Sequence, residues 1–183
     1  MEYKVSTNRI VHLFGTQGIV VFPRDAHAVT AGESPSTQFL HEVGLPHDDV
    51  FLSRIDTTGP SQDSVLLGAA LTQQERPCPP GAEKWLILGY FVDSLLVLDP
   101  ASQQVFAFPE GTDKYFPVHR DVESLVYALC ALQEFHLARD SAHDKQALAE
   151  GLRSAIADFD GLPFTDPLSE WNIIYAEILE GTW

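Results

Sequence analysis

Apolar residues gather in three short runs near the middle of the chain, at residues 85–91, 94–98 and 105–108. Each run has the length of a strand, and the connector at residues 99–103 reads Asp-Pro-Ala-Ser-Gln, a composition typical of turns. The three runs therefore predict an antiparallel meander. Because two of them are apolar at nearly every position, we expect other elements to cover both faces of this sheet.

Shorter apolar segments precede the meander. Residues 10–14 and 19–22 flank a Gly-Thr-Gln-Gly segment, which predicts a β-hairpin. A strand-like segment follows at residues 50–55. The run at residues 65–71 fits either a strand or a short buried helix, because periodicity over so few residues does not separate the two.

Two helices have clear capping signals. Ser34 can cap the first, Pro35 suits its first position, and Gly44 can end it. The second should begin after Asp121, because Asp is a favoured N-cap and the residues that follow recur at helical spacing. Its expected inner face consists of Val122, Leu125, Val126, Leu129, Leu132 and His136.

Two further helices are expected toward the C-terminus. The first has an apolar face of Leu148, Leu152, Ile156 and Phe159. The second should open at Asp166, with Pro167 in its first turn, and end near Gly181. Its apolar face consists of Trp171, Ile174, Tyr175 and Ile178. Since strands come first and helices last, the order predicts an α+β fold with a mostly antiparallel central sheet covered by helices.

The composition is that of a globular domain. The chain has 183 residues, of which 45% are hydrophobic and 20% charged, so it can bury a core of its own. We therefore expect a single domain over residues 1–183. The N-terminus lacks the basic and apolar regions of a signal peptide, and no apolar run approaches the roughly 20 residues that span a bilayer. These features predict a cytoplasmic protein that does not act in a membrane.

The charge is strongly negative. The chain has 26 Asp and Glu against 11 Lys and Arg, a formal charge of −15, and the acids are spread along it without an acidic block. Such a field repels nucleic acid and anionic membranes, so we expect neither as a partner. It speeds association with a basic protein and favours that class of partner. The alternative is that the acidity serves only solubility.

No motif of known catalytic chemistry occurs in the chain. It has no Gly-x-Ser-x-Gly elbow and no His-Glu-x-x-His pair, and its Gly-Thr-Gln-Gly segment lacks the Lys-Ser/Thr ending of a phosphate loop. Cys78 and Cys130 are too few for a disulfide framework or a cysteine zinc site. Cys130 should be buried, because its helical neighbours are apolar. We therefore predict no catalytic residue, no metal and no cofactor.

Two groups of charged side chains leave other chemistry open. Asp48 with Asp49, and Asp158 with Asp160, could each form a carboxylate pair, although adjacent acids in loops and at helix ends are common in so acidic a chain. A metal site would require the turn at residues 44–46 to bring several side chains together. These are His41, Glu42, His47, Asp48 and Asp49.

Aromatic residues cluster near acids in the last run of the meander and just after it. Most of them should be core, since large apolar residues in strands usually are, but any that face outward beside acids would suit a binding surface. The cluster contains Phe106, Phe108, Tyr115 and Phe116. We predict that the partner-binding residues include Asp48, Asp49, Glu110, Asp113 and Tyr115.

The order of these elements resembles that of a known superfamily. The residues that carry the resemblance are Phe39-Leu40, Gly44-Leu45-Pro46, Phe51, Leu88-Gly89-Tyr90, Leu96-Val97-Leu98-Asp99, Val105, Asp121-Val122-Glu123-Ser124-Leu125, Asp166-Pro167, Trp171 and Gly181-Thr182-Trp183. They span nearly the whole chain and are similar to the SUKH superfamily, which includes the SMI1/KNR4 domain, and most closely to its SUKH-4 immunity proteins. Several of them have plain roles as caps, turns and core, so they mark a fold rather than a chemistry.

The resemblance implies a bacterial antidote that binds and neutralises a cognate polymorphic toxin, often a nuclease or a nucleic-acid deaminase. It brings no catalytic residues to carry over. It also implies a use for the acidity, because toxins that act on nucleic acid tend to present a basic substrate cleft that an acidic domain could block. Inhibition from a surface remote from the toxin's active site is the alternative mechanism.

Two other functions remain open. The first is a non-catalytic scaffold or regulatory domain that binds a host protein, as eukaryotic relatives of the superfamily do. The second is a hydrolase or metal enzyme, which rests on the histidines and acids between His41 and Asp49.

Overall fold

The computed structural model describes residues 3–22, 34–53, 66–112 and 114–183, which form a mixed α+β fold, as predicted. The helices are α1 (Thr7–Phe14), α2 (Pro35–Glu42), α3 (Leu67–Gln73), α4 (Val122–Arg139), α5 (Lys145–Phe159), the 3₁₀ helix η3 (Leu162–Phe164) and α6 (Glu170–Glu180). The strands are β1 (Ile19–Val20), β2 (Leu45–Pro46), β3 (Phe51–Ser53), β4 (Leu86–Phe91), β5 (Ser94–Leu98), β6 (Val105–Pro109) and β7 (Phe116–His119).

The central sheet has the strand order β3-β4-β5-β6-β7, and each strand is antiparallel to its neighbours. The predicted meander is confirmed as β4, β5 and β6. The strand expected at residues 50–55 is present as β3, although residues 54 and 55 lie outside the described part of the chain. Strand β7 extends the sheet beyond what the sequence pattern predicted.

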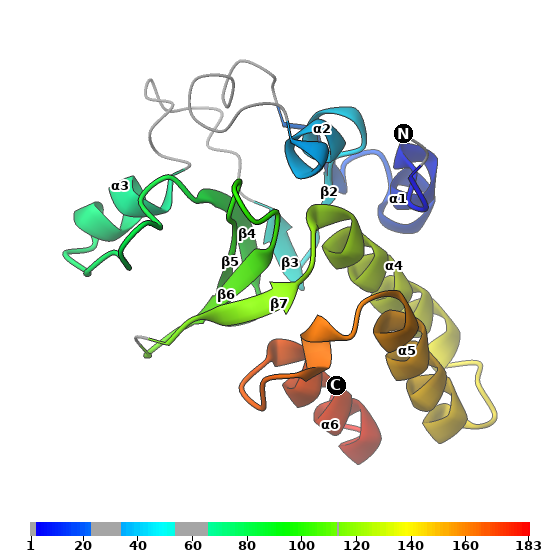
Figure 1. Cartoon of the computed structure of the whole chain (residues 1–183). Helices are drawn as coiled ribbons and strands as arrows, with labels where there is room; N and C mark the ends of the chain where they lie inside the picture. Colours follow the sequence, from blue (N-terminus) through cyan, green and yellow to red (C-terminus); the bar gives the residue numbers. More distant parts are fainter. Residues whose placement is uncertain (1–2, 23–33, 54–65, 113) are drawn as a thin grey trace.

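Both faces of the sheet are covered, by unequal layers. Figure 1 shows α3 on one side of the sheet and the helices α4, α5 and α6 on the other. The larger core lies on the α4 side and includes most of the buried residues of β4 and α4, together with Leu96 and Leu98 of β5. The smaller core lies on the α3 side, which we call the outer face. In the ambiguous run at residues 65–71, the chain is helical from Leu67 onward, while residue 65 lies outside the described residues. Leu67 and Leu71 pack onto this outer face.

The capping signals predict two helices correctly. Ser34 accepts a hydrogen bond from the Thr37 backbone N–H at the start of α2, and the chain reverses at Gly44. Asp121 likewise accepts from the Ser124 N–H at 2.7 Å, and α4 follows it for 18 residues. The long helix expected after Asp121 is thus confirmed, with Cys130 fully buried in it.

The hairpin expected at residues 10–22 is wrong. Residues 10–14 belong to helix α1, which Ser6 caps by accepting from the Arg9 N–H and which ends at Gly15 with φ 76°. Ile10 is fully buried in the larger core. Strand β1 pairs with β2 instead, since Val20 lies opposite Leu45. A helix forms here because its apolar face packs against α4, a long-range contact that local patterning does not reveal.

The last helix begins later than expected. Asp166 accepts a hydrogen bond from the Leu168 N–H and so closes a turn before the helix. Ser169 is the cap of α6, accepting from the Trp171 N–H. The end at Gly181 is confirmed, in the left-handed conformation that favours glycine at this position.

Candidate partner-binding surface

The sheet register brings most of the predicted acids to one end of the sheet. At this end lie the segment that leads into β3, the turn between β4 and β5, and the loop between β6 and β7. The Val92 N–H donates to the Val50 carbonyl at 3.1 Å, and the Glu110 N–H donates to the Asp93 carbonyl at 2.9 Å. These bonds tie the three segments side by side, and we call this region the acidic end.

The exposed acids of the acidic end are Asp49, Asp93 and Glu110. Across the described ranges, none of the three forms an ion pair with a cationic side chain. Asp48 differs, because its carboxylate accepts hydrogen bonds from the Val50 and Phe51 backbone amides and shapes the entry to β3. Asp113 lies outside the described residues. Asp93 is not among the acids predicted from the sequence, although its position between two apolar runs marks it as a turn residue.

A buried acid lies beneath the acidic end. Glu170, in the first turn of α6, is buried and accepts a hydrogen bond from the Ser94 hydroxyl at 2.9 Å. Burial raises the pKa of Glu170, the hydrogen bond from Ser94 opposes the shift, and the charges of Asp93 and Glu177 add to it. Of the exposed acids of the acidic end, Asp93 is therefore the one whose charge disfavours the ionised form of Glu170.

A row of large side chains crosses the outer face one step in from the acidic end. The register pairs Leu52 with Tyr90, Tyr90 with Leu95, and Leu95 with Phe108. Tyr115 continues the row by stacking on Phe108, with ring centroids 5.0 Å apart. The two ends of the row are open to solvent, since Leu52 is 49% exposed and Tyr115 is 41% exposed. The acids are thus bordered by large apolar and aromatic side chains.

A shallow pocket of about 300 Å³ adjoins Tyr115. The 76–80 segment forms one wall, and Leu71, Phe108 and Tyr115 form the rest. Arg76 donates to the Thr112 carbonyl, which places one cation at the rim. Burial raises the pKa of the Cys78 thiol, and Glu83 adds to the effect. The thiol is therefore protonated at neutral pH and is a poor nucleophile.

The predicted aromatic cluster divides between the two faces of the sheet. Phe106 and Phe108 lie on the outer face, and Trp85 stacks on Phe106 with centroids 4.5 Å apart. Phe116 is buried in the core on the opposite side. Only Tyr115 is exposed enough to contact a partner with much of its ring.

Among the histidines and acids between His41 and Asp49, His41 and Asp48 have separate partners. His41 Nδ1 lies 2.9 Å from the Phe22 carbonyl oxygen, and Asp48 binds backbone amides. Within the ranges that the structure describes, no three His, Cys, Asp or Glu side chains lie close enough to hold a metal ion. Cys130 is also unsuited to nucleophilic chemistry, because burial raises the pKa of its thiol to about 12.

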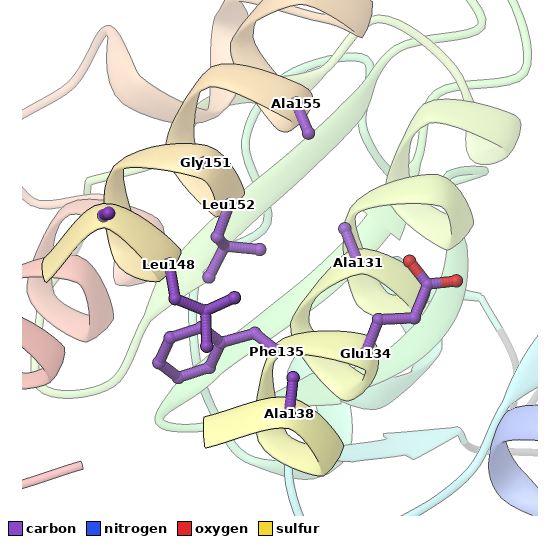
Figure 2. A pocket seen from close by; sticks show the side chains of 9 residues that line it. Ala131, Glu134, Phe135, Ala138, Leu148, Gly151, Leu152 and Ala155 are labelled. Atoms are coloured by element: carbon purple, nitrogen blue, oxygen red, sulfur yellow. The ribbon is translucent and has the colours of Figure 1, made fainter. Parts of the chain in front are cut away.

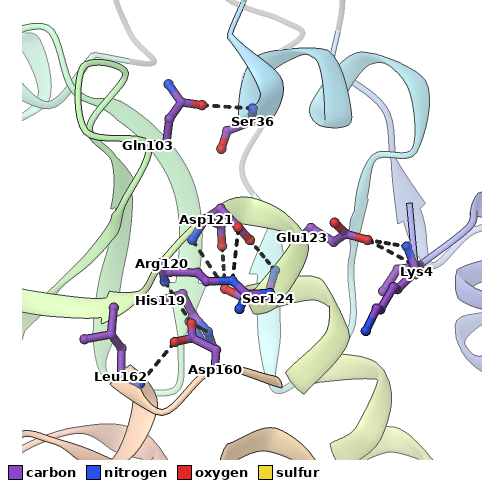
Figure 3. A network of polar contacts seen from close by, with 11 residues as sticks. Lys4, Ser36, Gln103, His119, Arg120, Asp121, Glu123, Ser124, Asp160 and Leu162 are labelled. Carbon is purple, nitrogen blue, oxygen red and sulfur yellow. Dashed lines mark hydrogen bonds and ion pairs between the residues drawn. The ribbon is translucent and has the colours of Figure 1, made fainter. Parts of the chain in front are cut away.

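One buried polar cluster joins β7, α5 and α6. The Trp171 indole N–H donates to His119 Nε2 at 3.0 Å, so the proton of the neutral imidazole is on Nδ1. Nδ1 faces the Asp160 carboxylate at 3.5 Å, the outer limit of a hydrogen bond. Asp160 also accepts from the Arg120 and Leu162 backbone amides, as Figure 3 shows. Because this cluster is buried, it holds elements together rather than meeting a partner.

The pKa values of this cluster follow from its burial. Burial lowers the pKa of His119, although the neighbouring Asp160 opposes the shift. Burial alone would raise the pKa of Asp160, but the hydrogen bonds from His119 and the two amides outweigh it and hold the pKa below its ordinary value. The cluster is therefore a neutral histidine beside an ionised carboxylate at neutral pH.

Comparisons with known proteins give one match. A family model described as SUKH-4 immunity protein matches residues 5–177, nearly the whole chain. None of the curated proteins and none of the solved structures matches it. In the described part of the chain, every helix is too short or too polar to cross a bilayer.

Proposed function

The chain belongs to the SUKH-4 immunity protein family, and from this premise we propose that it neutralises a cognate toxin by covering the toxin's basic substrate cleft with its acidic end. The toxin class that fits best is a nuclease or a nucleic-acid deaminase, because enzymes that bind polyanions need basic clefts. The proposed complex forms in the cytoplasm and involves no catalysis by this chain.

One observation carries the proposal. Asp49, Asp93 and Glu110 come from three separate segments, yet the sheet register lines them up at one exposed end without cationic partners among the described residues. Acids that are unpaired in the free protein are available to pair with a partner's lysines and arginines. In a chain with a formal charge of −15, they would also steer a basic toxin to this end.

The row on the outer face supports the same surface. Leu52 and Tyr115 are exposed at its two ends and lie next to the acids. Aromatic and aliphatic anchors beside a charged rim are the usual source of affinity in protein interfaces, while the charges mainly set the association rate. We therefore propose Tyr115 and Leu52 as anchors and Asp49, Asp93 and Glu110 as steering charges.

The experiment is a titration of the toxin encoded beside the gene for this chain. Addition of the purified chain should abolish toxin activity at a one-to-one ratio, because blocking a cleft is stoichiometric. A non-cleavable oligonucleotide that occupies the cleft should slow formation of the complex. If toxin activity stays unchanged in excess chain, the neutralising function is wrong. If activity is lost but the oligonucleotide does not compete, inhibition occurs from a remote surface.

A further inference from the structure

A groove of about 350 Å³ runs between α4 and α5, on a part of the molecule separate from the acidic end. Figure 2 shows the side chains of Phe135, Leu148 and Leu152 pointing into the space between the two helices, with small side chains beside them. The remaining lining residues are Ala131, Glu134, Ala138, Ala147, Gly151 and Ala155. The groove therefore has an apolar floor and walls made mostly of small residues.

The α5 wall of the groove allows another backbone to come close. Ala147, Gly151 and Ala155 recur every four residues, so they form one stripe along the helix. A Cβ added at Gly151 would meet no atom within 4 Å. The stripe is about 12 Å long at 1.5 Å per residue, which matches two turns of a second helix.

The ends and rim of the groove are acidic. Asp144 precedes the stripe as the N-cap of α5, where it accepts a hydrogen bond from the Ala147 N–H. Asp158 follows the stripe on the same side of the helix, and Glu150 is exposed beside it, where it accepts from the Gln146 side chain. Across the described chain none of these three forms an ion pair. Glu134 differs, since it pairs with Arg9 at 2.9 Å. An approaching chain therefore meets an apolar floor between carboxylates.

The lysines and arginines of α4 and α5 lie outside the lining of the groove. Arg139 donates to the Trp183 carbonyl at 2.6 Å, and both Arg139 and Lys145 line a neighbouring cavity rather than the groove. Arg153 lies over the rings of Phe164 and Tyr175. The rim acids of α5 thus have no basic neighbour in the groove itself.

We propose that the α4–α5 groove binds a basic amphipathic helix of a partner protein. Leucine-like residues of that helix would fill the space above Leu148 and Leu152, and its lysines or arginines would reach Asp144, Glu150 and Asp158. A second copy of this chain is disfavoured as the occupant, because the same acids on both copies would face each other across the contact. The inference is independent of the proposed toxin-binding end.

The test fills the groove without disturbing the helices. Gly151→Leu puts a side chain into open space at a helical position where leucine has the higher helix propensity, so the protein should fold at least as well. Ala157→Leu is the matched control, since Ala157 is exposed on α5 about 120° around the helix from Gly151. Circular dichroism and urea unfolding verify both variants.

The probe is a synthetic peptide of leucine and lysine, about 14 residues or four turns long, with leucine on one helical face. Isothermal titration calorimetry should show that this peptide binds the unaltered chain and A157L. Its affinity for G151L should be at least about tenfold lower. A peptide with glutamate in place of lysine should bind at least about tenfold more weakly than the lysine peptide.

Two results would overturn this proposal. The first is equal affinity of the lysine peptide for G151L and A157L, because binding would then not use the groove. The second is a dimer of the unaltered chain in sedimentation that G151L dissolves, which would assign the groove to a second copy.

Discussion

Asp160 and Asp158 are two residues apart in the chain, yet their environments are opposite. Asp160 is buried, and its carboxylate accepts hydrogen bonds from two backbone amides while it faces His119. Asp158 is exposed. From the sequence they are only a candidate carboxylate pair, because the contact of Asp160 with Arg120, just after β7, spans 40 positions and leaves no local signal. The residue types are plain from the sequence, but the different roles of these two carboxylates in the fold are not.

The different environments of Asp160 and Asp158 predict different effects of substitution on the free energy of unfolding. We expect Asp160→Asn to lower the free energy of unfolding by about 2 kcal/mol, because an amide group would turn an N–H toward buried donors. Asp158→Asn, the matched control, should change it by less than about 0.5 kcal/mol. Urea unfolding at neutral pH measures both, and equal values for the two variants would contradict the structural role of Asp160.

The same cluster predicts how stability depends on pH. The folded-state pKa of His119 is lowered by burial, so below about pH 6.5 the unfolded chain binds more protons than the folded chain and stability falls. The pKa of Asp160 is also lowered, so its contribution is present above about pH 4 and is lost as the pH falls further. Acid therefore destabilises the protein through two groups, His119 from about pH 6.5 downward and Asp160 from about pH 4 downward.

The contribution of His119 can be tested with histidine variants. Between pH 7.5 and 5.0 we expect His119→Gln to lose less stability than the unaltered chain, by at most about 1.4 kcal/mol per pH unit for one group. The half-buried His136, whose pKa burial also lowers, should retain part of the dependence. His143 is exposed, so His143→Gln should follow the unaltered chain. A pH dependence in His119→Gln identical to that of the unaltered chain would show that His119 is not the group responsible.

Among the elements, the sequence predicts best where capping and patterning agree. The meander follows from three apolar runs of strand length, and α4 follows from the helical spacing of its apolar residues and from Asp121 as a cap. Residues 10–14 were assigned wrongly, because a short apolar run suits either a strand or a helix. Ser6 as a cap and Gly15 as an ending favour the helix, but both local signals are weak. The contact of α1 with the core is the stronger effect.

Substitution of Gly89 in β4 and of Gly151 in α5 tests how closely other atoms approach these two elements. Gly89 lies in β4 with φ 156°, where a Cβ would collide with the Leu52 carbonyl oxygen of β3. We expect Gly89→Ala to lower the free energy of unfolding by about 2 kcal/mol and to loosen β3, seen as faster amide exchange at Val92. Gly151→Ala in the open helix face should raise it by about 0.5–1 kcal/mol. A neutral Gly89→Ala would mean that β3 does not pack this closely.

At the scale of the whole molecule, the family and the α+β class were accessible from the sequence, whereas the binding surface was only partly so. The acids predicted to bind a partner have only their loop positions in common. Nothing in the sequence shows that Asp49 and Glu110 share one end of the sheet. That proximity depends on strand pairing, which also adds Asp93 and the buried Glu170 to the same end. The individual partner-binding residues stay predictions.

If the acidic end steers the toxin, its charge should set the rate at which the toxin associates. Measuring that rate is the central test. A triple variant with Asp49, Asp93 and Glu110 each changed to lysine reverses the acidic end and leaves Asp48 in place to hold β3. Glu83→Lys is the control, because Glu83 is exposed near the opposite end of β4. Stopped-flow mixing with the cognate toxin should give an association rate at least about tenfold slower for the triple variant at low salt, with the difference shrinking at high salt. The control should slow association only slightly. If the triple variant associates as fast as the control at low salt, the toxin does not dock on the acidic end.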